Sequence, residues 1–257
     1  MAKLRKGLLA WFVNRRMRWY WSRAAAQAPQ TELAELRRQR TAARNLRHTL
    51  DELTYQADHR LALPRIGSTT FPRPQGTDWS WRPQAWREAL PVKGRAAIES
   101  RTTLGEEVAL FHDCRISELT LRQLRNTREA DLAPFGLRLD VFQFDGTFLS
   151  LVVNLPQDAC DGLRKRHLIR MDIIAEIETP LKIFARLNVR HGPNTEQIAR
   201  ELPLQEGQVM VEFDLAYTKL NEKRVESAWV DLILEGPQMN QVTVRDVTFC
   251  RVPRAVL

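Results

Sequence analysis

From about residue 104 to the end of the chain, apolar and polar residues alternate with a period of two. One apolar face per strand is typical of antiparallel sheets that pack face to face. We therefore expect a mainly β protein, a jelly-roll β-sandwich of about nine antiparallel strands. The strands are expected at residues 106–112, 118–124, 136–144, 147–155, 167–179, 181–190, 208–215, 226–235 and 241–252.

Three local signals refine this pattern. Asp145-Gly146 lies between two alternating segments and predicts a two-residue hairpin loop. The apolar parity switches within the last segment, which indicates a β-bulge near Arg245-Asp246. Residues 195–201 precede a proline and are predicted to form a short helix.

The first 60 residues show a helical pattern instead. Residues 1–28 are predicted to form one helix, broken near Pro29, and residues 31–59 a second. The second helix carries apolar residues at alternating spacings of three and four. This stripe predicts either that the helix packs on its own domain or that two copies associate through residues 36–57. These apolar positions are Ala43, Leu46, Leu50, Leu53 and Ala57.

Residues 61–94 combine five prolines with an unusual number of aromatic rings. Prolines exclude long helices and central strands, whereas polar linkers do not carry three tryptophans. We expect an extended strap that inserts its rings into the downstream domain or into a partner surface. The predicted organisation is a basic helical arm (1–60), a Pro/Trp-rich strap (61–94) and a β-sandwich domain (95–257).

The positive charge is concentrated in the arm. Residues 1–65 hold 14 Lys/Arg and 5 Asp/Glu, whereas the remaining residues hold 25 and 26. This asymmetry predicts attachment to phosphates, to anionic lipid or to an acidic protein. The candidate attachment residues are Trp11, Phe12, Arg15, Arg16, Arg18, Trp19, Tyr20, Trp21 and Arg23.

The apolar run at residues 8–13 is too short for a signal peptide or a spanning helix. We therefore expect a cytoplasmic protein with peripheral contact at the inner membrane. Within the sandwich domain, the basic residues Arg164, Lys165 and Arg166 at a hairpin are candidate anion contacts or simply a solvated loop.

No catalytic motif is present: the chain lacks G-x-S-x-G, a P-loop, H-E-x-x-H and a dinucleotide fingerprint. The three cysteines include no CxxC pair, so neither a disulfide framework nor a structural zinc site is expected. His112 and Cys114 share a strand face but lack a third ligand. We expect no enzyme activity, no cofactor and no metal, although the strands carry carboxylates at Asp140, Asp172, Glu176, Asp231 and Asp246.

Three apolar residues fall on the polar side of their strands. Trp229 and Ile233 lie opposite a core set, and Phe184 lies between Lys182 and Arg186. If adjacent and exposed, Trp229 and Phe184 form a stacking platform for a sugar ring. Alternatively, the strap covers them.

Two stretches, "GSTTFPRPQGTDWSWRPQAWR" and "VTVRDVTFCRVPRA", resemble an uncharacterised alphaproteobacterial domain-of-unknown-function family. That resemblance implies no known activity. From about Gly105 onward, the strand pattern and the closing strand also resemble galactose-binding-type jelly rolls, the scaffold of many carbohydrate-binding modules. This second resemblance implies that a ligand is held by aromatic residues on a concave face or by rim loops.

These observations favour a non-catalytic binding or adaptor protein whose sandwich recognises a glycan or a protein partner. The arm would attach it to an anionic membrane surface or to a larger complex. Two alternatives are an accessory structural subunit of a multiprotein membrane complex and a nucleic-acid-associated protein that binds through the arm. Nucleic acid is the less favoured partner, because no reading motif accompanies the charge.

Overall fold

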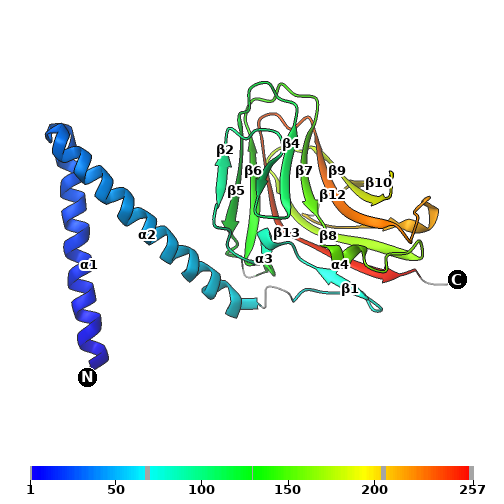
Figure 1. Ribbon diagram of the computed structural model, residues 1–257, viewed down its shortest axis with the longest axis horizontal. Helices are drawn as coiled ribbons and strands as arrows, with labels where there is room; N and C mark the ends of the chain where they lie inside the picture. Colours follow the sequence, from blue (N-terminus) through cyan, green and yellow to red (C-terminus); the bar gives the residue numbers. More distant parts are fainter. Residues whose placement is uncertain (1, 67–69, 129, 204–206, 255–257) are drawn as a thin grey trace. The chain divides into compact units, whose positions relative to one another are not determined.

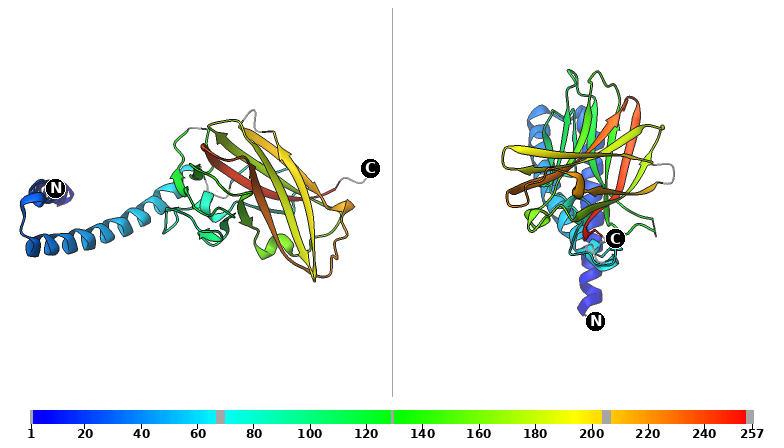
Figure 2. Two further views of the ribbon diagram at one scale, coloured as in Figure 1. Left: turned by 90° about the horizontal axis from the view of Figure 1, so that it is seen from above. Right: turned by 90° about the vertical axis from the view of Figure 1, so that its right-hand side faces the viewer.

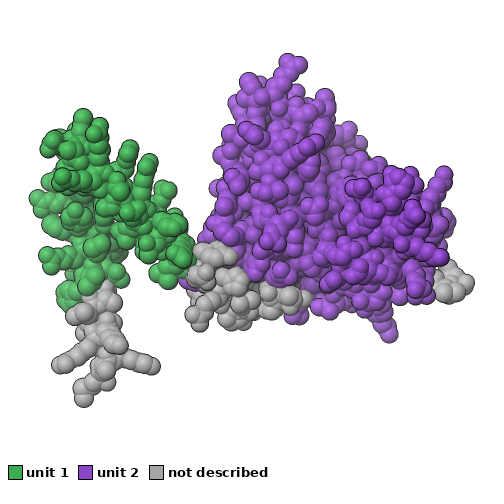
Figure 3. Space-filling view, in the orientation of Figure 1, with its two compact units in different colours: residues 1–56 green, residues 57–257 purple. Residues whose placement is uncertain are grey.

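The computed structural model describes residues 2–66, 70–128, 130–203 and 207–254, and side chains from residue 12 onward except at 55, 56 and 58–69. The chain forms two compact units, residues 1–56 and residues 57–257, which are coloured separately in Figure 3. The N-terminal helices are α1 (Ala2–Gln27), a 3-10 turn η1 (Ala28–Gln30) and α2 (Leu33–Ile66). The break at Pro29 is confirmed, and α2 continues seven residues beyond its predicted end.

The second unit is a β-sandwich of two antiparallel sheets, seen from three directions in Figures 1 and 2. We name the seven-stranded sheet "sheet A" and the six-stranded sheet "sheet B". In spatial order, sheet A contains β11 (Gln208–Asp214), β8 (His167–Ile177), β13 (Asn240–Pro253), β6 (Phe135–Val141), β5 (Leu119–Arg125) and β2 (Gly94–Ala96), with β1 (Trp79–Trp81) paired to β13. Sheet B contains β10 (Asn194–Leu202), β9 (Lys182–His191), β12 (Val225–Glu235), β7 (Leu149–Asn154), β4 (Val108–His112) and β3 (Thr102–Leu104).

The mainly β prediction is confirmed, and each of the nine predicted strands is present within a few residues of its expected bounds. The described residues form 13 strands rather than about nine. Strands β1, β2 and β3 are three residues long, too short to show a period of two.

The helix predicted at residues 195–201 is wrong. This segment is strand β10, paired along its whole length with β9. Its composition, "TEQIARE", favours a helix, but the free edge of sheet B offers a ladder of backbone hydrogen bonds that overrides this weak preference.

The hairpin predicted at Asp145-Gly146 is also wrong. The chain crosses here from β6 in sheet A to β7 in sheet B, over residues 142–148. Gly146 serves a close approach rather than a tight turn, because a Cβ at this position would lie 2.5 Å from Asp113 Oδ1. The Asp-Gly pair therefore lies where the chain crosses between the two sheets, and its geometry depends on the loop that contains Asp113.

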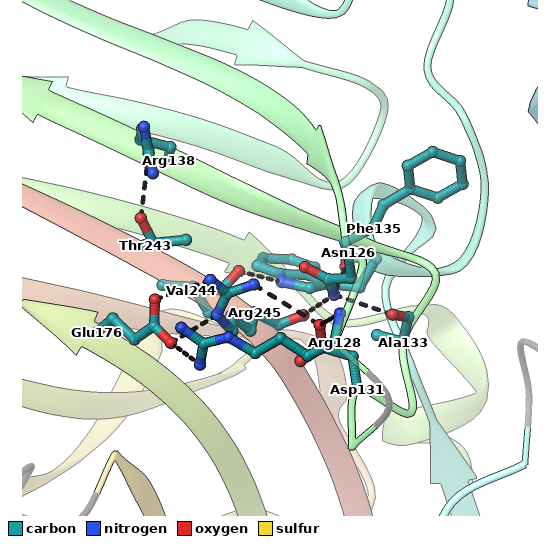
Figure 4. A network of polar contacts seen from close by, with 11 residues as sticks. Asn126, Arg128, Asp131, Ala133, Phe135, Arg138, Glu176, Thr243, Val244 and Arg245 are labelled. Carbon is teal, nitrogen blue, oxygen red and sulfur yellow. Dashed lines mark hydrogen bonds and ion pairs between the residues drawn. The ribbon is translucent and has the colours of Figure 1, made fainter.

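The predicted bulge is confirmed: the register of β13 against β8 shifts between Val244 and Asp246. Figure 4 shows the polar network around it. Asn126 Nδ2 donates to the Arg245 carbonyl at 2.8 Å, and Arg245 Nε and Nη2 donate to the Glu176 carboxylate at 2.6 and 2.9 Å. The extra residue in β13 is thus held by side chains from β8 and from the loop after β5.

The strap packs on its own domain, as the first of the two alternatives predicted. Trp86, in helix α3 (Gln84–Arg87), is fully buried and donates its indole N–H to the Val244 carbonyl at 2.9 Å. Arg82 forms a two-pronged ion pair with Asp246, at 2.9 and 2.8 Å. Trp81 lies with its ring centroid 5.9 Å from that of Phe249.

Two short turns complete the described elements, α4 (Gln157–Cys160) and η3 (Leu215–Tyr217). The three cysteines are free thiols. Burial raises the pKa of Cys160 and of Cys250 to about 11, so both are protonated packing residues at neutral pH.

Candidate functional site

The outer face of sheet B brings together the three apolar residues that the alternation places on the polar side. In β12 and β9 the core residues alternate with outward-facing ones, and these strands pair with Ile233 opposite Phe184, Asp231 opposite Arg186 and Trp229 opposite Asn188. Residues in neighbouring strands at these positions share the face. We call this surface the sheet-B face: Phe111, Ser150, Val152, Phe184, Arg186, Asn188, Gln197, Trp229, Asp231 and Ile233.

Asp231 is the hub of a hydrogen-bonded chain at the centre of this face. Arg186 Nε and Nη2 donate to Asp231 Oδ2 at 2.9 and 2.6 Å, and Asn188 Nδ2 donates to the same oxygen at 3.0 Å. Gln197 Nε2, from β10, donates to Asn188 Oδ1 at 3.0 Å. Charge-assisted bonds of this kind fix the orientation of the planar groups.

The centre of the face is buried, although its side chains point away from the core. Asp231 is 4% exposed and Val152 8%, whereas Trp229 and Phe184 are partly exposed. The Ser150 hydroxyl oxygen lies buried here with no hydrogen-bond partner among the described residues. Ser150 lies opposite Ile233 and Phe111 in the neighbouring strands, so this hydroxyl belongs to the buried centre of the face.

The aromatic residues do not form the adjacent platform that the sequence suggested. Ile233 lies directly opposite Phe184, but Trp229 lies four residues farther along β12, which is roughly 13 Å at strand spacing. The Asp231–Arg186 pair occupies the row between them. Two separated apolar contacts with a polar centre suit an elongated ligand better than a single ring.

The rival interpretation, in which the strap covers these rings, finds no support. The contacts described for residues 70–90 involve sheet A, Glu107 and α4, and none of them reaches Trp229 or Phe184. Trp229 and Phe184 also lie outside the hydrophobic core.

Several residues of the face were missed in the sequence. Ser150 and Phe111 are in strands whose apolar runs hide which side faces outward, and Gln197 is in the segment predicted as a helix. The pairing of β9 with β12 is the information that brings Asn188 beside Trp229. The alternation within β9 places Asn188 on the outward face, but it does not show that Trp229 is its neighbour.

The other candidates are used structurally. Both ring nitrogens of His112 are occupied, since Nε2 bonds the Ile98 carbonyl at 2.7 Å and Nδ1 accepts from the Cys114 N–H at 3.1 Å. The five carboxylates singled out in the sequence each hold an arginine: Asp140 with Arg122, Asp172 with Arg170, Glu176 with Arg245, Asp231 with Arg186 and Asp246 with Arg82. Among the described residues, no group of three or more His, Cys, Asp or Glu side chains could hold a metal ion.

In the arm, Phe12, Trp19 and Tyr20 are 62%, 60% and 49% exposed, and Trp21 meets Tyr20 edge-on at 5.2 Å. The Arg23 guanidinium lies over the Trp19 ring at 5.4 Å. Arg15, Arg16 and Arg18 are exposed as well, whereas the side chain of Trp11 lies outside the described residues. Within the described part of the chain, no helix has the length and apolar character needed to cross a membrane.

The basic residues predicted at a hairpin lie instead in a loop between a helix and a strand, away from the sheet-B face. Arg164, Lys165 and Arg166 lie between α4 and β8, where the Lys165 N–H donates to Glu222 Oε1 at 2.8 Å and the Arg166 carbonyl accepts from the Arg254 N–H at 2.7 Å.

The sequence of residues 1–257 matches the model of a family of unknown function (DUF6478). No curated protein matches the chain. Among solved structures, the xylan-binding domain CBM22-1 from Paenibacillus barcinonensis is 11% identical, with a TM-score of 0.37, over 63% of this chain and 94% of that one. A family 11 carbohydrate-binding module from Clostridium thermocellum is 9% identical, with a TM-score of 0.35, over 64% of this chain and 99% of that one.

An enzymatically active domain of a tailspike protein from bacteriophage CBA120 is 6% identical, with a TM-score of 0.41 over 56% of this chain. This chain spans about a fifth of the length of that domain, 19%. TM-scores below 0.5 leave the ligand to be argued from the side chains of the sheet-B face.

Proposed function

Because the chain belongs to this family of unknown function, its own side chains have to indicate its role, and we propose that it binds a neutral glycan on the sheet-B face. The observation that carries this proposal is the buried, hydrogen-bonded Asp231 hub between two partly exposed apolar contacts, Trp229 on one side and Phe184 with Ile233 on the other. Sugars combine an apolar ring face with a rim of hydroxyls, which matches rings beside fixed polar groups.

Two features favour a neutral ligand. The Asp231 carboxylate is matched by Arg186, and the neighbouring Arg190 pairs with Glu226 at 3.2 Å. Because these charged side chains are paired with one another, the face attracts neither a cation nor an anion strongly. The exposed amide of Gln197, held by its bond to Asn188 Oδ1, supplies both a donor and an acceptor for hydroxyl groups.

The face also favours binding over catalysis. Asp231 accepts from Arg186 and Asn188 and lies beneath the surface at 4% exposure. A pair of facing carboxylates with room for water is the usual requirement for glycoside hydrolysis. The carboxylates singled out here are each engaged by an arginine instead.

The test is a glycan array with the full-length protein, followed by calorimetry on any glycan bound. We expect saturable binding that is insensitive to salt and at least tenfold weaker in Trp229→Ala, a loss of about 1.4 kcal/mol or more. Tyr217→Ala removes an 82% exposed ring elsewhere and serves as the matched control. Absence of binding to every glycan, or equal binding by Trp229→Ala, contradicts the proposal.

A second role is supported by the arm, which we propose attaches the protein to an anionic membrane surface. Helix α1 holds seven Lys/Arg and no acid, and it exposes Phe12, Trp19 and Tyr20. Cations near an anionic leaflet contribute about 1 kcal/mol each, and aromatic rings favour the interface.

Co-sedimentation with vesicles tests this second role. The full chain should bind anionic but not neutral vesicles, and replacing Arg16, Arg18 and Arg23 by Gln should weaken binding roughly a hundredfold. Replacing Arg164, Lys165 and Arg166 by Gln is the charge-matched control. No binding at low salt, or tighter binding to nucleic acid than to lipid, rejects it.

A further inference from the structure

Helix α2 carries a narrow apolar stripe with no described element packed extensively against it. Leu50 and Leu53, near the middle of the helix, are 51% and 64% exposed. Most of the stability of a protein helix comes from packing one apolar face, so a helix of 34 residues that exposes leucines in this way is incomplete alone.

The spacing of the apolar stripe indicates what kind of surface packs against it. From Leu36 to Ala57 the positions alternate by three and four residues, so only two of every seven residues are in the stripe. A helix that covers its own domain usually has a wider apolar face, whereas a two-in-seven stripe is the seam of a coiled coil. The first position of each heptad is Leu36, Ala43, Leu50 and Ala57, and the fourth is Gln39, Leu46 and Leu53.

We propose that α2 pairs with α2 of a second copy of this chain in a parallel, in-register coiled coil. In this arrangement Glu35, before the first seam position, meets Arg40 of the second copy, and the symmetric contact forms on the other side. The antiparallel arrangement instead brings Arg47 against an arginine of the second copy, Arg40 or Arg47 according to the stagger. Charge therefore selects the parallel orientation.

Gln39 selects the register. It is the polar residue within the seam, and a buried polar side chain in a coiled coil specifies alignment at some cost in stability. With the helices parallel and unshifted, Gln39 faces Gln39 of the second copy and the two amides bond to each other. Any shift by a heptad places Gln39 against Leu46 or Leu53, where its amide keeps only the long 3.4 Å contact with Glu35 of its own helix.

Such a dimer has a functional consequence, given the sheet-B face proposed above. Two copies joined through α2 present two faces to one glycan polymer, and linked sites bind more tightly than single ones by mass action. Dimerisation is measured without any ligand, so its failure and the failure of glycan binding are separate results.

The test uses single cysteine variants of the full chain, oxidised and examined without reducing agent. Gln39→Cys and Leu53→Cys should each form a disulfide-linked dimer, because in-register parallel helices bring identical seam positions together. Thr41→Cys, on the far side of the helix, and the unmodified chain with its native thiols are the matched controls. In an antiparallel dimer neither seam variant links to itself, which overturns the proposal.

Light scattering supplies the second measurement. The chain should have twice the mass of one copy, and Leu50→Asp should reduce it to the mass of one. His48→Asp introduces the same charge outside the seam and should leave the dimer intact. A single-copy mass for the unmodified chain at every concentration, or an unchanged mass for Leu50→Asp, overturns the proposal.

Discussion

The two outer faces of the sandwich both carry arginine–carboxylate pairs, but they differ in what surrounds them. On sheet A, the side chains of Asp140, Asp172 and Glu176 are 13%, 22% and 35% exposed. On sheet B, the side chain of Asp231 is 6% exposed and is flanked by Trp229 and Phe184. Ion pairs at a wet surface are ordinary, so the burial of Asp231 between two apolar contacts is the feature on which the proposed site rests.

Asp246, on sheet A, is as buried as Asp231, but for a different reason. The strap covers it, and its partner Arg82 is a strap residue with a fully buried side chain. Asp231 is covered by the side chains of its own sheet face. The first carboxylate thus fastens one segment to another, whereas the second holds side chains of a single sheet face together.

The largest effect is expected from breaking the strap pair. Arg82→Ala leaves the Asp246 carboxylate buried without its cation, which should lower the free energy of unfolding by about 3–5 kcal/mol. Urea unfolding at pH 7 measures this loss. Burial already raises the pKa of Asp246, so the variant should recover part of its stability as the pH falls and the carboxyl takes up a proton. A loss below 1 kcal/mol would show that the strap is not fastened by this pair.

A smaller loss is expected on sheet B. Arg186→Ala removes one donor from Asp231, but Asn188 still bonds the same oxygen and the Arg186 side chain is 37% exposed. The free energy of unfolding should fall by about 1–3 kcal/mol. If the sheet-B face is the glycan site, binding weakens in the same variant. Stability that falls as far as in Arg82→Ala would instead mark Arg186 as a purely structural residue.

The strands could be predicted because one face of each is buried, so apolar and polar residues alternate along the sequence. Trp229, Ile233 and Phe184 stood out for the same reason, as apolar residues on the wrong parity. The Asn188–Gln197 contact could not be predicted, because it depends on which strands are neighbours and on β10 being a strand. The reading of Asp145-Gly146 failed for a related reason: local turn chemistry does not show that the chain changes sheets.

At low pH the ion pair between Glu176 and Arg245 on sheet A should contribute less to stability, and the Glu176→Gln variant tests this. Hydrogen bonding to Arg245 lowers the pKa of Glu176 below its ordinary value of 4.5. A carboxyl group with a lowered pKa in the folded state contributes stability above its unfolded pKa and loses it as the pH falls toward the folded value. Glu176→Gln should therefore be less stable than the unmodified protein at pH 6, with the difference shrinking below about pH 4.5. Parallel pH profiles for the two proteins would contradict this assignment.

The smallest effect is expected for another arginine–aspartate pair, in which the arginine also donates through Nε and Nη2. Arg170 Nε and Nη2 donate to Asp172 at 2.7 and 2.8 Å on the outer face of sheet A, with side chains 28% and 22% exposed. In Arg170→Ala, water can hydrogen-bond the Asp172 carboxylate in place of the lost guanidinium. The free energy of unfolding should therefore fall by no more than about 1 kcal/mol. Calorimetry should show glycan binding unchanged in this variant and weakened in Arg186→Ala. Since both substitutions remove a two-pronged arginine from an aspartate, equal losses of binding would mean that net charge, rather than the sheet-B face, holds the ligand.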